Sequence, residues 1–383
     1  MSASTSCKER AAALLAAARR GVLPPADEIR DLGENCPGEF FRDVIEPLGD
    51  SFNAAQASVY ERIMRVWIPA RAAVTPSIPD TVDAVYVLSR VTLGADIKIV
   101  SPILDAMKRR FPGARIVFVA NRKSAELFGA DSRITHLDAA YPRSGPVSGR
   151  IAFAGELARR LDDGIVIDPD SRITQLGLLP VAPPERTFHF SSRSVGGETD
   201  NLSGLVRGWL RETFGVEGSA YIAPKREQAA GARPFAAVSL GVGENESKRV
   251  AGDFESRLIA ELGKRFATIW VDRGAGGEEA RRVTAAAAGA ADRVRFWEGS
   301  FAGFASIISQ SDLYVGYDSA GQHAAAAAGV PSVTIFAGAP SDRFRRRWAA
   351  AGNGSTVQIQ ADSLSSDEIL TAFVTQFPQT GIK

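Results

Sequence analysis

One segment, residues 311–336, has the residue types of a phosphate-binding site. An apolar run ends there in Asp318 and Ser319, and a predicted helix opens near Gln322. The first turn of a helix leaves backbone N–H groups unpaired and carries the positive end of the helix dipole, which suits a diphosphate. Asp and Ser are also common helix caps, so the spacing alone favours capping and phosphate binding equally.

Charged residues in two other segments could act on a phosphate-linked substrate. Asp96 lies near the start of a predicted helix, where a carboxylate facing a cleft can accept a proton from a hydroxyl group. Lys248 and Arg249 follow a predicted strand, and positive charge there stabilises the negative charge that grows on a leaving diphosphate. The alternatives are that Asp96 is a helix-start acid favoured by the dipole and that the basic pair is a solvated surface feature.

Acidic and glycine residues after strands suggest contacts to a nucleotide. Glu278 follows a strand at the place where an acid can bind ribose hydroxyls, although Glu279 competes with it and both suit a first helical turn. Gly241 and Gly243 begin a dinucleotide-binding pattern, but its third glycine is absent. An NAD site is therefore not favoured.

The remaining candidates are acids and histidines of the kind that bind metals. Asp168 and Asp170 are separated by one residue, a spacing that invites a metal interpretation. His136 and His189 fall in or beside predicted strands and are interpreted as ordinary, partly buried histidines. His323 falls in a first helical turn, where a neutral imidazole can form local hydrogen bonds.

Most of these candidates follow strands in a repeating pattern of strands and helices. Up to residue 78 the chain shows helical patterns broken at prolines, and from residue 82 short apolar runs alternate with segments of helical period. Such alternation predicts two parallel sheets, each covered on both faces. The predicted strands are residues 82–88, 115–120, 134–137, 165–168 and 187–190, then 235–240, 267–272, 294–297, 313–317 and 332–336. The predicted helices are residues 97–111, 150–161 and 201–214, then 253–266, 278–289, 303–309 and 322–328.

The pattern divides the chain into a helical extension and two doubly wound domains. Such domains bind ligands at the carboxyl ends of their strands, so we expect the functional site in a cleft between the two. The predicted boundaries are 1–78 for the helical extension, 79–223 for a first Rossmann-like domain, 224–234 for a linker and 235–383 for a second Rossmann-like domain.

Composition narrows the class of protein. The 383 residues exceed one hydrophobic core, and 45 basic against 44 acidic residues leave no overall field for nucleic acid or an anionic membrane. Cys7 and Cys36 cannot form a disulfide framework or a zinc site, and we expect a cytoplasmic, reducing location. No run approaches the ~20 apolar residues that span a bilayer, so any membrane contact is expected to be peripheral.

Two motifs resemble those of the bacterial lipopolysaccharide heptosyltransferase family. Asp318 is followed by Ser, by His323 five residues on, and by an alanine-rich helix that ends in Gly-x-Pro before an apolar strand. In the first domain, Arg90 and Asp96 precede Pro102, which lies six residues beyond the aspartate as in that family. The resemblance covers about residues 82–375.

The resemblance implies a GT-B fold, which has two facing Rossmann-like domains, and an ADP-heptose-type donor. It makes residues 79–223 the N-terminal acceptor domain and residues 235–383 the C-terminal sugar-nucleotide-binding domain. It also implies catalysis without a metal or other cofactor, with Asp96 as general base. Two departures, Ala95 and Ala320, stand where the family has glycine, and their methyl groups are expected to narrow the donor pocket or change the turn. The implied donor-binding residues are Lys248, Arg249, Glu278, Asp318, Ser319, Ala320, Gly321 and His323, and the acceptor-side residues are Arg90, Thr92 and Asp168.

The expected function is that of an inverting, metal-independent glycosyltransferase. It would move a heptose or related sugar from a nucleotide-diphosphate donor, expected to be ADP-linked, to the hydroxyl of a glycan, glycolipid, small molecule or protein. The alternatives are a sugar-nucleotide epimerase or hydrolase of the same fold and a non-catalytic sugar-nucleotide-binding protein.

Overall fold

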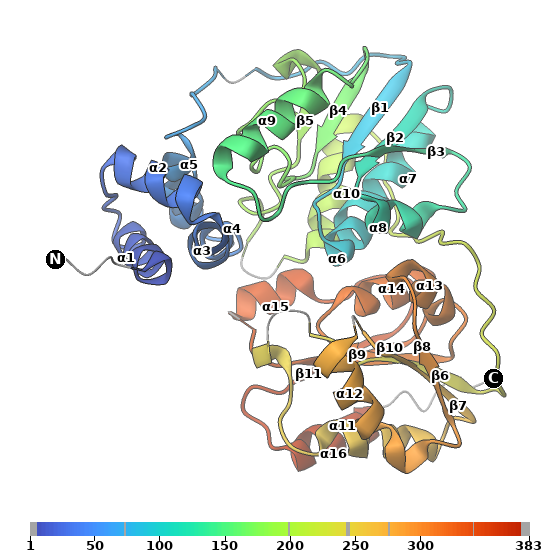
Figure 1. Cartoon of the computed structure of the whole chain (residues 1–383). Helices are drawn as coiled ribbons and strands as arrows, with labels where there is room; N and C mark the ends of the chain where they lie inside the picture. Colours follow the sequence, from blue (N-terminus) through green and yellow to red (C-terminus); the bar gives the residue numbers. More distant parts are fainter. Residues whose placement is uncertain are drawn as a thin grey trace.

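The structure is a computed structural model that describes residues 6–72, 74–197, 200–242, 246–274, 276–339 and 341–376. A helical extension packs beside the first of two domains, and each domain is built on a parallel sheet with helices on both faces (Figure 1). The predicted α/β class, with two Rossmann-like sheets, is confirmed. Within the described ranges, no helix is both long and apolar enough to cross a bilayer.

The first sheet has five parallel strands in the order β3-β2-β1-β4-β5. Its central strand is the run AVYVL, which is buried on both faces as a central parallel strand requires. The strand order reverses between β1 and β4, which is where such sheets open a ligand crevice. The strands are β1 (Ala84–Leu88), β2 (Arg115–Ala120), β3 (Ile134–Asp138), β4 (Ile165–Asp168) and β5 (Thr187–His189). The helices are α6 (Leu93–Ala95), the π-helical η2 (Asp96–Val100), α7 (Ser101–Arg110), α8 (Arg122–Ala125), η3 (Glu126–Phe128), α9 (Val147–Ala158), η4 (Pro184–Arg186) and α10 (Leu202–Phe214).

The second sheet has six parallel strands in the order β11-β10-β9-β6-β7-β8, and its order reverses between β6 and β9. Both predicted series of strands are present within one or two residues at each end. Three further elements, β11, α15 and α16, have no counterpart among the predicted ones. The strands are β6 (Phe235–Ser239), β7 (Thr268–Asp272), β8 (Val294–Trp297), β9 (Leu313–Tyr317), β10 (Ser332–Phe336) and β11 (Thr356–Gln360). The helices are η5 (Glu246–Lys248), α11 (Phe254–Gly263), α12 (Gly277–Ala286), η6 (Ala288–Ala290), α13 (Phe301–Ile308), α14 (Ala320–Ala328), α15 (Asp342–Trp348) and α16 (Ser366–Gln376).

Two helices at the domain boundary begin earlier than predicted. The helix predicted from residue 97 begins at Leu93, in α6, and passes through the π-helical turn η2 before α7. Helix α14 begins at Ala320 because Ser319 is still extended, with φ of −152°, and it ends at Gly329, whose φ is +74°. Both early starts bring helical backbone close to the ends of β1 and β9.

The helical extension forms a small apolar core of its own against the first domain. The single disulfide between Cys7 and Cys36 joins the start of α1 to the residue before α3. The two cysteines therefore do not indicate a reducing compartment, because disulfides persist in oxidising environments. The helices of the extension are α1 (Cys7–Arg19), α2 (Ala26–Asn35), α3 (Pro37–Glu39), the π-helical η1 (Phe40–Ile45), α4 (Glu46–Gly49) and α5 (Ala54–Met64).

A buried lysine ties the two domains together. Lys98 is 2% exposed, and its Nζ donates to Asn201 Oδ1 at 2.9 Å, to Ser203 Oγ at 3.1 Å and to the backbone oxygen of Ala349 at 2.7 Å. Burial lowers the pKa of Lys98 to about 7. Since Ala349 belongs to the second domain, this one ammonium group spans the boundary.

Replacing Lys98 by Met should lower the free energy of unfolding by about 2 kcal/mol or more, because buried acceptors on both domains lose their shared donor. Urea unfolding at pH 6, where Lys98 is still charged, measures the change. The matched control is Lys123→Met on α8, where the lysine is exposed. Equal losses in the two variants would contradict the bridging role.

Candidate functional site

A cavity of ≈ 250 Å³ lies between the domains, where the strand order of each sheet reverses. Segments that follow β1, β4 and β5 line it from the first domain, and segments that follow β6 and β9 line it from the second. Its lining residues are Asp50, Arg90, Thr92, Gly94, Ala95, Arg172, Arg193, Lys248, Asp318, Ser319, Ala320, His323, Phe344 and Trp348. Most of the predicted donor residues, together with Arg90 and Thr92, therefore meet in one place.

An ion pair fixes a lysine on the second-domain wall of this cavity. Lys248 Nζ lies 2.7 Å from Asp318 Oδ2, and Gln322 Nε2 donates to the other oxygen, Asp318 Oδ1, at 2.5 Å. The side chains of Lys248 and Asp318 are 20% and 9% exposed. The aspartate thus orients the ammonium group at the cavity.

The first turn of α14 faces the same cavity without a side-chain cap. Ser319 is the N-cap residue, but its side chain accepts no capping hydrogen bond within the described chain. Its Oγ is buried and has no hydrogen-bond partner among the described residues. The N–H groups of this turn are therefore not occupied by the side chain that could cap them, which favours the phosphate-binding interpretation.

A neutral histidine packs at the tightest point between the domains. His323 is 5% exposed, and burial, reinforced by the charges of Lys98 and Lys248, holds its pKa well below the ordinary value. A Cβ atom added to Gly94 would lie 3.1 Å from His323 Cδ2 and 3.5 Å from the Cα of Ala320. Glycine at position 94 is what allows the first domain to approach α14 this closely.

The glycine at position 321 is required by the residue beneath it. A Cβ atom there would overlap the hydroxyl group and ring of Tyr314, which is fully buried in β9. The Cα atom of Ala320 instead lies near Gly94. Ala95 and Ala320, the two departures from the family pattern, both line the cavity.

The predicted base, Asp96, is not on the cavity surface. It is fully buried, its Oδ1 accepts from Arg90 N and its Oδ2 accepts from Ser89 Oγ, both at 2.8 Å. Burial raises the pKa of this carboxyl to about 6, although hydrogen bonds from neighbouring groups oppose the shift. Its neighbour Ala95 lines the cavity, whereas the carboxylate faces the turn after β1.

The predicted acceptor-side residue Asp168 is also buried behind the wall. It accepts from Ser171 N at 2.7 Å and from Thr174 Oγ1 at 2.5 Å, so it shapes the loop that carries Arg172. Burial raises its pKa, partly opposed by the charge of His189. Its effect on the cavity is therefore indirect.

The second aspartate of this loop binds protein groups rather than forming a metal cluster. Asp170 Oδ1 lies 2.8 Å from His189 Nε2, and its Oδ2 accepts from Arg193 N at 2.8 Å. Although burial acts the other way, this hydrogen bond and the aspartate charges raise the pKa of His189 to about 9. Across the ranges that the structure describes, no group of three or more His, Cys, Asp and Glu side chains could hold a metal ion.

Three predicted donor residues, Gly321, Arg249 and Glu278, do not line the cavity. Gly321 packs on Tyr314, behind the first turn of α14. Arg249 pairs with Glu246, at 3.1 Å between Nη2 and Oε1, and does not line the cavity. Glu278 is exposed on the first turn of α12.

The neighbouring acid has the better position for a nucleotide. A Cβ atom on Gly274 would lie 2.5 Å from Glu279 Cδ, and one on Gly241 would overlap Glu279 Oε1. These glycines follow β7 and β6, so the geometry favours Glu279 over Glu278. The two glycines are the signal in the sequence that could have distinguished the acids. Gly243 of the dinucleotide pattern lies outside the described residues.

Several cavity residues were not among the predicted site residues. Asp50 comes from the helical extension, Arg172 and Arg193 follow β4 and β5, and Phe344 and Trp348 belong to α15. They are distant in sequence, and neither their types nor their spacing marks them.

Comparison with known proteins identifies the class of fold and domain. Residues 221–368 match the model of glycosyltransferase family 9 (heptosyltransferase). This segment, which contains the second sheet, is similar to a family 9 glycosyltransferase domain. The predicted heptosyltransferase family and the predicted enzyme class, a glycosyltransferase, are confirmed. A comparison with curated protein sequences finds no match.

Solved structures share the two-domain arrangement around this family 9 domain. The Escherichia coli heptosyltransferase WaaC with ADP-2-deoxy-2-fluoro heptose has a TM-score of 0.56 and 17% identity, over 77% of this chain and 99% of that one. A family 9 glycosyltransferase from Veillonella parvula has a TM-score of 0.56 and 16% identity, over 76% and 96%. The E. coli ADP-heptose lipopolysaccharide heptosyltransferase II has a TM-score of 0.52 and 16% identity, over 77% and 99%. These likenesses confirm the GT-B fold.

Replacing Gly321 by Ala should lower the free energy of unfolding by about 2 kcal/mol or more, because the new methyl group overlaps the buried Tyr314. Chemical denaturation measures the loss. The matched control is Gly289→Ala, since a Cβ atom at Gly289 meets no described atom within 4 Å. If both variants were equally stable, the close packing of Tyr314 on α14 would be refuted.

Proposed function

We propose that this protein transfers a sugar from a nucleotide-diphosphate donor to an acceptor hydroxyl, with inversion at the anomeric carbon and without a metal ion. The observation that carries the proposal is the meeting of Lys248 with the uncapped first turn of α14 in the interdomain cavity. The E. coli WaaC structures contain ADP and an ADP-linked fluoro heptose, which favours an ADP-linked heptose or a related sugar as the donor.

The second domain supplies the groups that a leaving diphosphate needs. The N–H groups of Ala320 and Gly321 and the dipole of α14 would bind phosphate oxygens. Lys248, oriented by Asp318, would neutralise the charge that develops as the bond from sugar to phosphate breaks. A fixed ammonium group and backbone amides together do the work that a metal ion does in other transferases.

The first domain would supply the base. An acceptor hydroxyl must lose its proton as it attacks the anomeric carbon, and a carboxyl with a pKa of about 6 suits this task near neutral pH. Asp96 follows directly on Gly94 and Ala95, which line the cavity. The proposal requires its side chain to turn from Ser89 and Arg90 into the cavity when the substrates are bound.

The burial of Asp96 favours a second candidate, a protein that binds sugar nucleotides without transferring the sugar. That candidate predicts donor binding and no turnover with any acceptor. An epimerase or hydrolase of the same fold would instead consume the donor in the absence of an acceptor.

The proposal is tested with purified protein, ADP-, GDP- and UDP-linked sugars and a panel of hydroxyl acceptors, all in the presence of EDTA. Thermal stabilisation reports donor binding, and product analysis reports transfer and the anomeric configuration. Lys248→Met should lower kcat by about 10²- to 10³-fold, because one stabilising charge on the leaving group is lost. Stabilisation by none of these donors would refute the assignment of the donor site.

Asp96→Asn should lower kcat by at least about 10²-fold while leaving donor affinity unchanged. In the unchanged protein, kcat/KM should fall as pH drops through about 6, because protonation removes the base.

The folded protein holds this proton more tightly than the unfolded chain, whose carboxyl has the ordinary pKa of 3.8, so stability falls as pH rises from about 4 to about 6. Asp96→Asn should therefore be at least as stable as the unchanged protein at pH 7, so a loss of activity cannot be attributed to unfolding. A variant with full activity would favour a different base.

Glu279→Gln should weaken ADP binding by about tenfold, because its carboxylate faces the ends of β6 and β7 where a ribose would lie. Glu278→Gln is the matched control and should bind ADP as the unchanged protein does. Isothermal titration measures both affinities, and a larger loss in the control would return the ribose contact to Glu278.

A further inference from the structure

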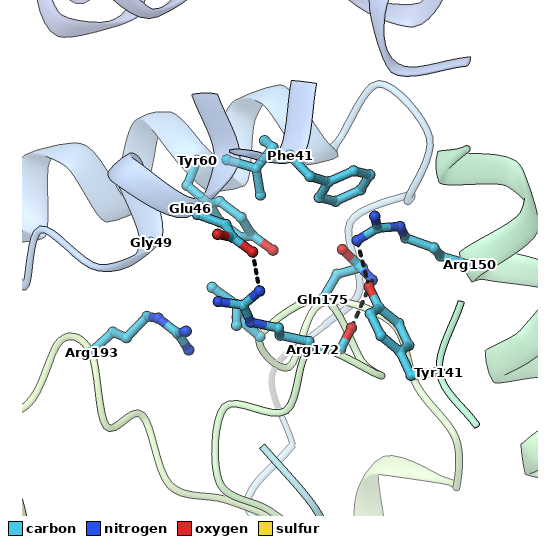
Figure 2. A pocket seen from close by; sticks show the side chains of 11 residues that line it. Phe41, Glu46, Gly49, Tyr60, Tyr141, Arg150, Arg172, Gln175 and Arg193 are labelled. Carbon is cyan, nitrogen blue, oxygen red and sulfur yellow. Dashed lines mark hydrogen bonds and ion pairs between the residues drawn. The ribbon is translucent and has the colours of Figure 1, made fainter. Parts of the chain in front are cut away.

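One turn of the helical extension forms part of the cavity wall. Asp50, the residue after α4, lines the interdomain cavity, and Gly49 lines an adjoining cavity of ≈ 20 Å³ beneath the extension. Figure 2 shows this smaller cavity, with Glu46 on the side of the extension and Arg172 and Arg193 on the side of the first domain. Both arginines line both cavities, so the extension reaches the site through them.

The extension neutralises two of the three cavity arginines. Asp50 Oδ1 accepts from Arg193 Nε at 3.2 Å and from Arg193 Nη2 at 3.1 Å, and Glu46 accepts from Arg172 Nη1. Burial acts to raise the pKa of Asp50, but the charges of Arg193, Arg172 and Arg90 hold it below the ordinary value. The carboxylate is therefore ionised at neutral pH and occupies the Arg193 guanidinium.

The same turn is held against the second domain by an aromatic ring. Phe52 is 1% exposed, its ring centroid lies 6.1 Å from that of Phe344, and the Arg347 guanidinium lies 4.9 Å from its centroid. Its φ of 52° is costly for a residue with a side chain, so the surrounding packing must stabilise this conformation. Asp50 is thus fixed from both domains.

The third arginine keeps open donors. Arg90 is 3% exposed, and its Nε and Nη1 are buried without a hydrogen-bond partner among the described residues. Its guanidinium lies 5.9 Å from the ring centroid of Trp348. Burial, together with the charge of Arg193, lowers its pKa to about 9, so it is still cationic at neutral pH. An anion at this point would satisfy donors that the protein leaves open.

We propose that the extension sets the charge of the acceptor that this site takes. Asp50 pairs with Arg193 and leaves Arg90 to bind an anionic group of the acceptor. The site therefore binds an acceptor that has a single anionic group near its hydroxyl, and it rejects one that has clustered phosphates or carboxylates. Asp50 is a specificity residue that acts through Arg193. This inference rests on the proposed function, because only a transferase has an acceptor. The preference for a single anionic group rests on the charges of the cavity alone.

The test compares binding of inorganic phosphate and inorganic pyrophosphate by isothermal titration, with saturating ADP present to occupy the donor site. Asp50→Asn should bind pyrophosphate at least tenfold more tightly than the unchanged protein, because Arg193 is released, and the gain should shrink with added salt. Glu61→Gln, at an exposed acid of the same extension that pairs with Arg65, is the matched control and should show no gain. Asp50→Glu should retain the weak pyrophosphate binding of the unchanged protein.

Two arginine variants keep the inference falsifiable if Asp50→Asn does not fold. Arg90→Gln should lose phosphate binding by more than tenfold. Arg193→Gln should weaken it by clearly less, because Asp50 already occupies that guanidinium and only the repulsion from the unpaired carboxylate is added. A loss in Arg193→Gln equal to that in Arg90→Gln, or a folded Asp50→Asn with no gain, overturns the inference. If ADP itself does not bind, the proposed function fails, and the comparison of the two arginine variants still decides the charge of the site.

Discussion

The site depends on one close approach between the domains, at Gly94. Because this residue has no side chain, the first turn of α6 lies against Ala320 and His323 at the start of α14. The approach places the end of β1 opposite the end of β9 and sets the width of the cavity between them. The buried bridge from Lys98 to Ala349 and the apolar cluster that continues from the first sheet into α13 and α14 hold the domains in this arrangement.

A conflict between folding and reaction is visible at Asp96. Burying a carboxylate raises its pKa and costs stability at neutral pH, and in this structure the turn after β1 offsets that cost with two hydrogen bonds. The same hydrogen bonds hold the group away from the cavity. For Asp96 to act as a base, its side chain must therefore leave these hydrogen bonds, which costs free energy. Functional residues often carry such unfavourable local energetics.

The sequence predicts the strands well because buried parallel strands are short apolar runs, as AVYVL in β1 and LYVGY in β9 illustrate. It does not predict β11 or α15, because TVQIQ and DRFRRRW mix polar and apolar residues on half-exposed elements. In the site, residues tied to local motifs, such as Lys248 and Asp318, reach the cavity as expected. Asp50 and Arg193 are brought there only by tertiary packing. The choice between Glu278 and Glu279 depends on which acid lies against Gly241 and Gly274, the glycines that follow β6 and β7.

The π-helical turn η2, which starts at Asp96, holds one residue more than an α-helical turn. If the π-helical turn moved by one residue towards the amino end of the helix, Asp96 would rotate about the helix axis by about 100°. This is the angle between successive residues in an α-helix. The backbone would need no hinge and the domains no separation for such a step. A shift of register in this single turn would be enough to move the carboxylate to another face of the helix.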